Sequence, residues 1–205
     1  MAHLILKMIG YKSLSIQLKA RKLTMNKKNS IYIATSLDGF IADKNGGIAW
    51  LDSIAIPENE DMGYLAFMED IDALVMGRVT FETVLGFDVV WPYTKPVFVL
   101  SNTLKEIPES HQGKAYLVKG TLPVILEQIH QKGYKRLYID GGTTIQSFLK
   151  KDLIDEMIIT TFPILLGGGT SLFADLPKAM DFELVESKVY FDHLLQHHFR
   201  RKREN

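Results

Sequence analysis

The 205-residue sequence predicts an α/β protein with a mostly parallel sheet, helices on both faces, and an antiparallel pair of strands at the C-terminus. Three observations lead to this fold class. Short apolar segments alternate with helix-like segments from residue 30 onward, glycine leads two strand-to-helix turns, and only three residues separate the last two apolar segments. With 46% hydrophobic and 23% charged residues, the composition suits a globular domain that buries its own core.

The expected elements follow in close succession. A strand at 31–36 leads into a loop with turn signals at Asp38-Gly39 and 45–47, and a helix at 58–69 then begins with acidic residues. In this helix, Leu65 and Met68 are expected to face the core. Further strands are expected at 72–76, 96–100, 115–118, 136–140, 156–165, 183–190 and 194–201, and further helices at 79–85, 121–132 and 141–152.

Composition restricts the partners of the chain. Residues 1–29 contain seven Lys or Arg and no Asp or Glu, whereas residues 30–205 contain seventeen basic and twenty-four acidic residues, a net charge of −7. A body of this charge binds nucleic acid poorly. There is no cysteine, which excludes disulfides and thiolate metal sites, and no apolar run approaches the roughly 20 residues of a membrane span. We expect a cytoplasmic protein that does not bind nucleic acid or enter a membrane and has no metal site.

The basic stretch at 1–29 allows two interpretations. Its composition is typical of a transit peptide, or the chain proper begins at Met25, shortly before the first expected strand at Ile31. Under either interpretation we expect residues 1–29 to be an N-terminal extension and residues 30–205 to form a single domain.

Two strand-to-helix junctions carry residues suited to phosphate. In the segment VMGRVTFE, Gly77 ends a strand, Arg78 follows with a planar cationic group, and Thr80 adds a hydroxyl. The second junction is the run DGGTT at 140–144. Glycine at such a place lets a ligand approach the backbone, and the first amides of the following helix favour an anion.

Each junction taken alone can be a simple turn, because neither is a Walker loop or a G-x-G-x-x-G fingerprint. Ligands of parallel α/β sheets bind at the carboxyl ends of the strands, where both junctions are expected. Two phosphate-suited junctions at the same edge favour a pyrophosphate or a dinucleotide.

Four segments, in this order, resemble the dihydrofolate reductase fold: IATSLDGFIADKNGGIAWL at 33–51, MGRVTFE at 76–82, VLSNT at 99–103 and IDGGTTIQSFL at 139–149. The chain more closely resembles the reductase domain of the bifunctional riboflavin-biosynthesis deaminase–reductase, from about Ile31 to the C-terminus. Dihydrofolate reductases commonly have three glycines and a basic residue in the last motif. Here Asp140 and Thr143 stand at two of those positions, which favours the riboflavin type.

The resemblance implies NADPH as cofactor and gives each segment a part in binding it. The loop at 38–47 resembles a mobile loop that closes over the nicotinamide ring. The implied contacts are Ala34 and Ile41 for the nicotinamide carboxamide; Gly77, Arg78 and Thr80 for the adenosine-side phosphates; Leu100, Ser101 and Asn102 for the adenine ribose and its 2′-phosphate; and Gly141, Gly142, Thr143 and Thr144 for the pyrophosphate.

The same resemblance suggests residues for substrate binding and proton transfer. Asp140 is expected to face the substrate, although it can equally cap the next helix. Trp50 matches a tryptophan of the family near the substrate. Asp61 and Asp38 are the candidate proton donors, with structural alternatives as an acid at a helix start and as a turn residue.

The activity that the resemblance implies is NADPH-dependent reduction of a pyrimidine- or pteridine-like molecule, nearest to 5-amino-6-(5-phosphoribosylamino)uracil reductase. Two alternatives stay open: a dihydrofolate reductase or other small-molecule reductase, and a non-catalytic dinucleotide-binding module. The companion deaminase is excluded because its zinc site needs cysteines that this chain lacks. The resemblance also leads us to expect a homodimer.

Overall fold

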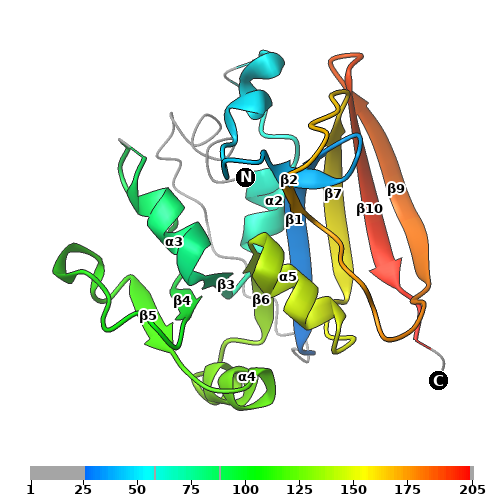
Figure 1. The fold of residues 1–205 in the computed structure, drawn as a ribbon. Helices are drawn as coiled ribbons and strands as arrows, with labels where there is room; N and C mark the ends of the chain where they lie inside the picture. Colours follow the sequence, from blue (N-terminus) through cyan, green and yellow to red (C-terminus); the bar gives the residue numbers. More distant parts are fainter. Residues whose placement is uncertain (1–25, 58, 88, 204–205) are drawn as a thin grey trace.

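The computed structural model describes residues 26–57, 59–87 and 89–203, and its centre is an eight-stranded sheet in the order β5-β4-β3-β6-β1-β7-β10-β9 (Figure 1). The strands from β5 to β7 pair in parallel. Strands β10 and β9 are antiparallel to their neighbours. These pairings confirm the predicted fold class, including the antiparallel C-terminal pair.

The sheet strands are β1 (Lys28–Ser36), β3 (Ala73–Gly77), β4 (Val97–Leu100), β5 (Ala115–Val118), β6 (Arg136–Asp140), β7 (Glu156–Phe162), β9 (Phe182–Tyr190) and β10 (Leu194–Arg201). The helices are α2 (Tyr64–Glu69), α3 (Arg78–Leu85), α4 (Leu122–Gln131) and α5 (Gly142–Leu149), with short 3-10 turns η1 (Ala49–Ser53) and η2 (Glu109–His111). A small second sheet pairs β2 (Phe40–Ala42) with β8 (Thr170–Ser171).

Alternating side chains of the strands build a core on each face of the sheet. Ile31, Val75 and Ile139 pack with the buried residues of α4 and α5 on one face. The next residues along the strands, Tyr32 and Met76 among them, pack with those of α2 and α3 on the other face. Helices therefore cover both faces, although β10 and β9 extend beyond them (Figure 1).

The helix expected at 58–69 is the largest departure from the predicted elements. Of its described residues, 59–69, only the last six, Tyr64–Glu69, are helical. Met62 and Gly63 have positive φ angles of 49° and 86°, which no right-handed helix accommodates, so the chain turns before α2 begins. As a result Met68 is buried, as expected, whereas the side chain of Leu65 is exposed.

The first strand includes two residues of the expected N-terminal extension, Lys28 and Asn29. Strand β1 starts at Lys28, whose ammonium lies 2.6 Å from Glu156. Asn29 is buried, and its backbone N–H donates to Asp155 (2.7 Å) while its side-chain amide donates to the carbonyl of Leu153 (2.7 Å). Lys28 and Asn29 thus belong to the sheet, and residues 1–25 of the basic stretch lie outside the described residues.

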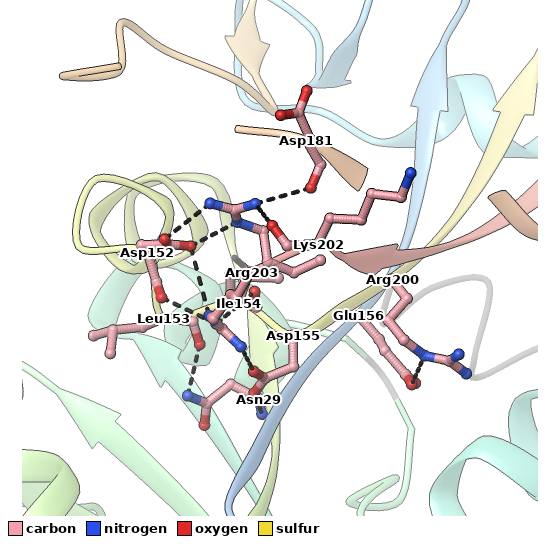
Figure 2. Close-up of polar contacts among 11 residues, drawn as sticks. Asn29, Asp152, Leu153, Ile154, Asp155, Glu156, Asp181, Arg200, Lys202 and Arg203 are labelled. Atoms are coloured by element: carbon pink, nitrogen blue, oxygen red, sulfur yellow. Dashed lines mark hydrogen bonds and ion pairs between the residues drawn. The ribbon is translucent and has the colours of Figure 1, made fainter. Parts of the chain in front are cut away.

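The C-terminal residues are tied to the same end of the sheet. Figure 2 shows Arg203 beside Asp155 and Asp152. Arg201 donates two hydrogen bonds of 2.8 and 3.0 Å to the Asp152 carboxylate. This contact holds the pKa of the Asp152 carboxyl below its usual value. The start of β1 and the end of β10 are therefore joined through the turn between α5 and β7.

Candidate functional site

A cavity of about 640 Å³ lies at the carboxyl ends of the parallel strands. Both phosphate-suited junctions and the end of β4 contribute to its wall. Of the residues expected to bind cofactor or substrate, those that line it are Ile41, Gly77, Arg78, Thr80, Leu100, Ser101, Asn102, Asp140, Gly141, Gly142, Thr143 and Thr144. Segments separated by more than sixty residues in the sequence are thus brought to one binding surface.

The two glycine-led junctions contact each other directly. Gly141 has φ +88°, and a Cβ placed there would lie 2.1 Å from the hydroxyl oxygen of Thr80. A Cβ at Gly77 would lie 3.0 Å from the hydroxyl oxygen of Thr144. Gly141 therefore cannot carry a side chain without displacing Thr80, whereas a Cβ at Gly77 would require a small shift of the Thr144 hydroxyl.

The helices that begin at these junctions present their first amides without side-chain caps. Helix α3 has Gly77 as its N-cap and α5 has Gly141, and neither N-cap makes a side-chain capping hydrogen bond. The N–H groups of a first helical turn have no partner within the helix, and they lie at the positive end of its dipole. Two such helix starts facing one cavity suit the adjacent phosphates of a dinucleotide.

Arg78 lines the cavity and pairs with a side chain of its own helix. Its guanidinium is 2.9 and 3.0 Å from the two carboxylate oxygens of Glu82, one turn along α3. Both side chains are roughly half exposed. Arg78 also lines a second, more open hollow together with Thr103 and Lys105. Lys105 is a second cation near this position. It lies in the loop after β4 and outside the four segments that resemble the family, so no sequence signal pointed to it.

Asp140 is a buried acid at the end of β6, with 3% of its surface exposed. Its Oδ1 accepts a hydrogen bond from the Gly141 N–H (2.8 Å), and its Oδ2 is buried without a hydrogen-bond partner among the described residues. Burial raises the pKa of this carboxyl, against the smaller opposing effect of the Gly141 hydrogen bond. Asp140 can therefore hold a proton at a pH where an exposed aspartate is ionised.

Ala34 and Trp50 do not line the cavity. Both are buried in a third apolar cluster, with Leu51, Met62, Phe162 and Leu194, where the Trp50 ring meets Phe162 edge-on at 5.4 Å between centroids. Their neighbours Ile33, Ile41 and Ile48 do reach the cavity. The cluster thus packs against the wall of the cavity through Ile48, which contacts the cluster and lines the cavity.

The two candidate proton donors are engaged elsewhere. The Asp38 carboxylate accepts hydrogen bonds from the Ser36 hydroxyl (2.6 Å) and from the N–H groups of Leu166 and Gly167, and these contacts lower its pKa, the Ser36 bond most. Asp61 accepts from the N–H groups of Gly63 and Leu65, at the start of α2. Neither lines the cavity, and both carboxylates make the contacts expected of their structural alternatives, a turn residue and an acid at a helix start.

The described residues contain no group of three or more His, Asp or Glu that could hold a metal ion, and no helix among them is long and apolar enough to cross a membrane.

The sheet order and the cavity at its carboxyl edge define the protein as one with the dihydrofolate-reductase-like fold. Dihydrofolate reductase from Enterococcus faecalis has this fold, with a TM-score of 0.59 at 16% identity over 86% of this chain and 97% of that one. Within that class, the family model of the RibD C-terminal domain matches residues 30–195, and the chain belongs to this family. The predicted relationship to the riboflavin-type reductase domain is thereby confirmed.

This chain covers nearly the whole length of two relatives. A solved structure from Shewanella sp. PV-4, assigned provisionally to riboflavin biosynthesis, is 55% identical with a TM-score of 0.83, over 86% of this chain and 99% of that one. The Bacillus subtilis protein YwjB, which is uncharacterised, is 34% identical over 180 residues, or 86% of this chain and 99% of its own. Membership of the RibD family supports an oxidoreductase of the riboflavin-pathway type.

Proposed function

We propose that this chain is an NADPH-dependent reductase of a small ribosylated pyrimidine, similar in activity to 5-amino-6-(5-phosphoribosylamino)uracil reductase. The observation that carries the proposal is the meeting of two uncapped helix starts and a buried acid in one cavity. Such a cavity can hold the phosphates of a dinucleotide and place a protonated group beside a small substrate.

The residues present fit the dinucleotide. The N-caps of α3 and α5 make no side-chain capping hydrogen bond, so phosphate oxygens can bind the first N–H groups of both helices. The cofactor, when bound, supplies the hydride. The chain binds its phosphates through these amides, and Ser101 and Asn102 offer neutral hydrogen bonds to the adenosine side.

Arg78 and Lys105 support the choice of NADPH over NADH. Together with Glu82 and Glu106, they line the open hollow next to the end of β4, where the resemblance puts the 2′-phosphate. A dianionic phosphate there would meet a planar guanidinium and an ammonium, and a plain ribose hydroxyl would gain little from either.

Asp140 is the residue we assign to the substrate. In its protonated form it can donate a hydrogen bond from Oδ2 to a substrate oxygen or nitrogen, and in its ionised form it can accept two from a ribose. We assign proton transfer to this residue in preference to Asp38 and Asp61, because Asp140 alone of the three lines the cavity. Replacing it with Asn keeps the shape and removes the titrating proton.

The proposal includes the organisation of the protein: residues 30–205 with Lys28 and Asn29 as one catalytic domain, acting in the cytoplasm as a homodimer. These features follow from the resemblance to riboflavin-type reductases and from the contacts of Lys28 and Asn29 with the sheet.

A substrate panel tests the function. Pure protein is mixed with NADPH and either ribosylaminopyrimidine phosphates or dihydrofolate, and the loss of reduced nicotinamide absorbance is followed. We expect turnover with the pyrimidines, and turnover that falls at least tenfold in Asp140→Asn while NADPH affinity is kept. Turnover with dihydrofolate alone would identify a dihydrofolate reductase. Tight NADPH binding without any turnover would indicate a non-catalytic dinucleotide-binding module.

A further inference from the structure

Two buried tyrosine hydroxyls have no hydrogen-bond partner among the described residues. They belong to Tyr64, the first residue of α2, and to Tyr93, in the segment between α3 and β4. These residues are only 2% and 5% exposed. The Oδ2 atom of Asp140 is a third buried oxygen in the same condition. Buried polar atoms nearly always have a partner, so each of these three oxygens calls for one.

The alternation of side chains along β6 directs Asp140 towards the two tyrosines. Ile139 packs in the core on the α4 and α5 face of the sheet, whereas Tyr138 packs on the opposite face with Tyr64 and Tyr93. Successive side chains of a strand point to opposite faces, so Asp140 is on the same face as Tyr138. The three oxygens without partners therefore lie on one side of the sheet.

Electrostatic interaction also places these groups near one another. Burial raises the pKa of the Tyr64 and Tyr93 hydroxyls, and the charge of Asp140 is the next cause in both. Asp140 acts on Tyr138 as well, after burial, but the Tyr138 hydroxyl donates to the carbonyl of Tyr32 (2.9 Å) and is satisfied. The hydroxyls of Tyr64 and Tyr93 are the ones left to interact with Asp140.

We propose that Tyr64 and Tyr93 are positioning residues for Asp140: buried water links their hydroxyls to Oδ2 and orients the carboxyl towards the substrate. Buried water typically makes about three hydrogen bonds to groups that otherwise lack partners. Neither tyrosine lines the cavity, so a substrate in the cavity meets Asp140 and not the hydroxyls. A carboxyl oxygen has more than one hydrogen-bonding site, so Oδ2 can accept from water and still face the substrate.

The inference rests on the role proposed for Asp140, and it predicts how that carboxyl titrates. A hydrogen bond from water to the carboxylate favours the ionised form and opposes the effect of burial. Strand β3 and helix α5, which flank Asp140, carry no titratable side chain. Arg78 is the cation among the described residues that lines the cavity with Asp140, and it pairs with Glu82.

NMR titration of the Asp140 carboxyl carbon tests the proposal without any need for turnover. The protein is labelled with ¹³C-aspartate, and Asp140→Asn assigns the signal. Tyr64→Phe and Tyr93→Phe each remove one hydroxyl and keep the ring. We expect each change to raise the pKa of Asp140 by about 0.5–1 pH unit. A crystal structure of the original protein should show ordered water linking Oδ2 to both hydroxyls.

Tyr32→Phe is the matched control in the same buried cluster. The Tyr32 hydroxyl donates to the carbonyl of Met62 (2.9 Å), so its loss should lower the melting temperature and leave the titration of Asp140 unchanged. In protein that turns over, the alkaline limit of kcat/KM should move to higher pH in Tyr64→Phe and Tyr93→Phe, in step with the pKa of Asp140, and should stay in place in Tyr32→Phe.

Three outcomes would overturn the proposal. The first is an Asp140 titration that is unchanged in both Tyr64→Phe and Tyr93→Phe. The second is an equal shift in Tyr32→Phe, which would indicate a general effect of the cluster. The third is a clear rise in melting temperature in Tyr64→Phe and Tyr93→Phe, because removing a hydroxyl that has no partner stabilises a protein. Absence of turnover in the original protein would instead contradict the proposed function, and the NMR titration would still decide the role of the tyrosines.

Discussion

The guanidinium of Arg78 lies within 3.0 Å of both carboxylate oxygens of Glu82, at the start of the helix that faces the cavity. This ion pair within helix α3 is the structural alternative to a phosphate contact. Because both side chains are roughly half exposed, the pair is worth only a few tenths of a kcal/mol. A phosphate dianion can displace it at little cost, so Glu82 can orient Arg78 without preventing it from binding a ligand.

The first prediction concerns this arginine. Arg78→Ala should weaken NADPH binding by roughly ten- to a hundredfold, since a charge-assisted hydrogen bond contributes about 1.5–3 kcal/mol, and should change NADH binding much less. Arg78→Lys should recover only part of the loss. Glu82→Gln, which removes the competing carboxylate, should strengthen NADPH binding slightly. Calorimetric titration of both cofactors measures these effects, and an unchanged NADPH-to-NADH ratio in Arg78→Ala would reduce Arg78 to a helix-stabilising residue.

A second prediction concerns Gly142, where a Cβ would lie 2.8 Å from the Thr170 methyl and 3.1 Å from Ile41. Gly142→Ala should lower the free energy of unfolding by about 1–3 kcal/mol through overpacking. Gly142→Val should abolish NADPH binding while the protein remains folded. The contact with Thr170 offers a way to separate packing from ligand binding.

Thr170→Ser removes the crowded methyl. Combined with Gly142→Ala, it should restore most of the stability, as followed by urea unfolding, and leave NADPH affinity low. Affinity that returns together with stability would mean that Gly142 serves packing alone.

The fold was predictable from the sequence where the signals are local. Apolar runs with β-type residues gave strands that agree with the structure to within a few residues, such as 136–140 and β6. The glycine-led turns predicted the cavity. A glycine before a helix lets a ligand approach the backbone at the helix start, and this does not depend on where the helix packs. Strands β2 and β8, of three and two residues, carry no periodic signal and were missed.

The roles of the remaining site residues were not predictable from local patterns, in part because contacts such as those of Asp38 and Lys105 come from distant segments. Asp38 and Asp61 matched the family by position, yet their carboxylates bind backbone N–H groups of turns, including Gly167, 129 residues away from Asp38. The turn that shortens α2 depends on Met62 at a positive φ, a conformation its residue type does not indicate. Lys105 lies outside every recognised segment and comes near Arg78 only through the sheet.

A third prediction separates the N-terminal extension from the domain. Deleting residues 1–24 should leave the melting temperature and NADPH affinity unchanged. Deleting residues 1–29 should lower the melting temperature by several degrees, because Asn29 is buried and loses hydrogen bonds to Asp155 and Leu153, each worth about 1 kcal/mol. Thermal unfolding of both truncations is the measurement. A large loss of stability from the shorter deletion would show that residues 1–24 contribute to the domain.

The last prediction concerns Glu156, which lies between three cationic side chains. Its Oε2 is 2.6 Å from Lys28 and 3.2 Å from His198, and its Oε1 is 3.4 Å from Arg200. Burial raises the pKa of this carboxyl, but the hydrogen bonds from His198 and Lys28, with the charge of Lys28, outweigh burial and lower the pKa to about 2. A folded pKa below the unfolded value means that ionised Glu156 stabilises the fold. That stabilisation is complete above the unfolded pKa of about 4.5 and is lost as the pH falls from there towards about 2. Because the site is partly open to solvent, we expect a stabilisation of about 1–2 kcal/mol at neutral pH rather than the full value of the shift.

Urea unfolding of the original protein and of Glu156→Gln, over a pH series, measures this stabilisation. The difference in unfolding free energy between the two should be constant above about pH 5 and should shrink at lower pH. Glu183→Gln, which removes a carboxylate that also pairs with Arg200, serves as the matched control and should show a smaller difference at neutral pH. If the difference for Glu156→Gln stays the same down to about pH 2.5, the side chain stabilises the sheet by packing and not by its charge.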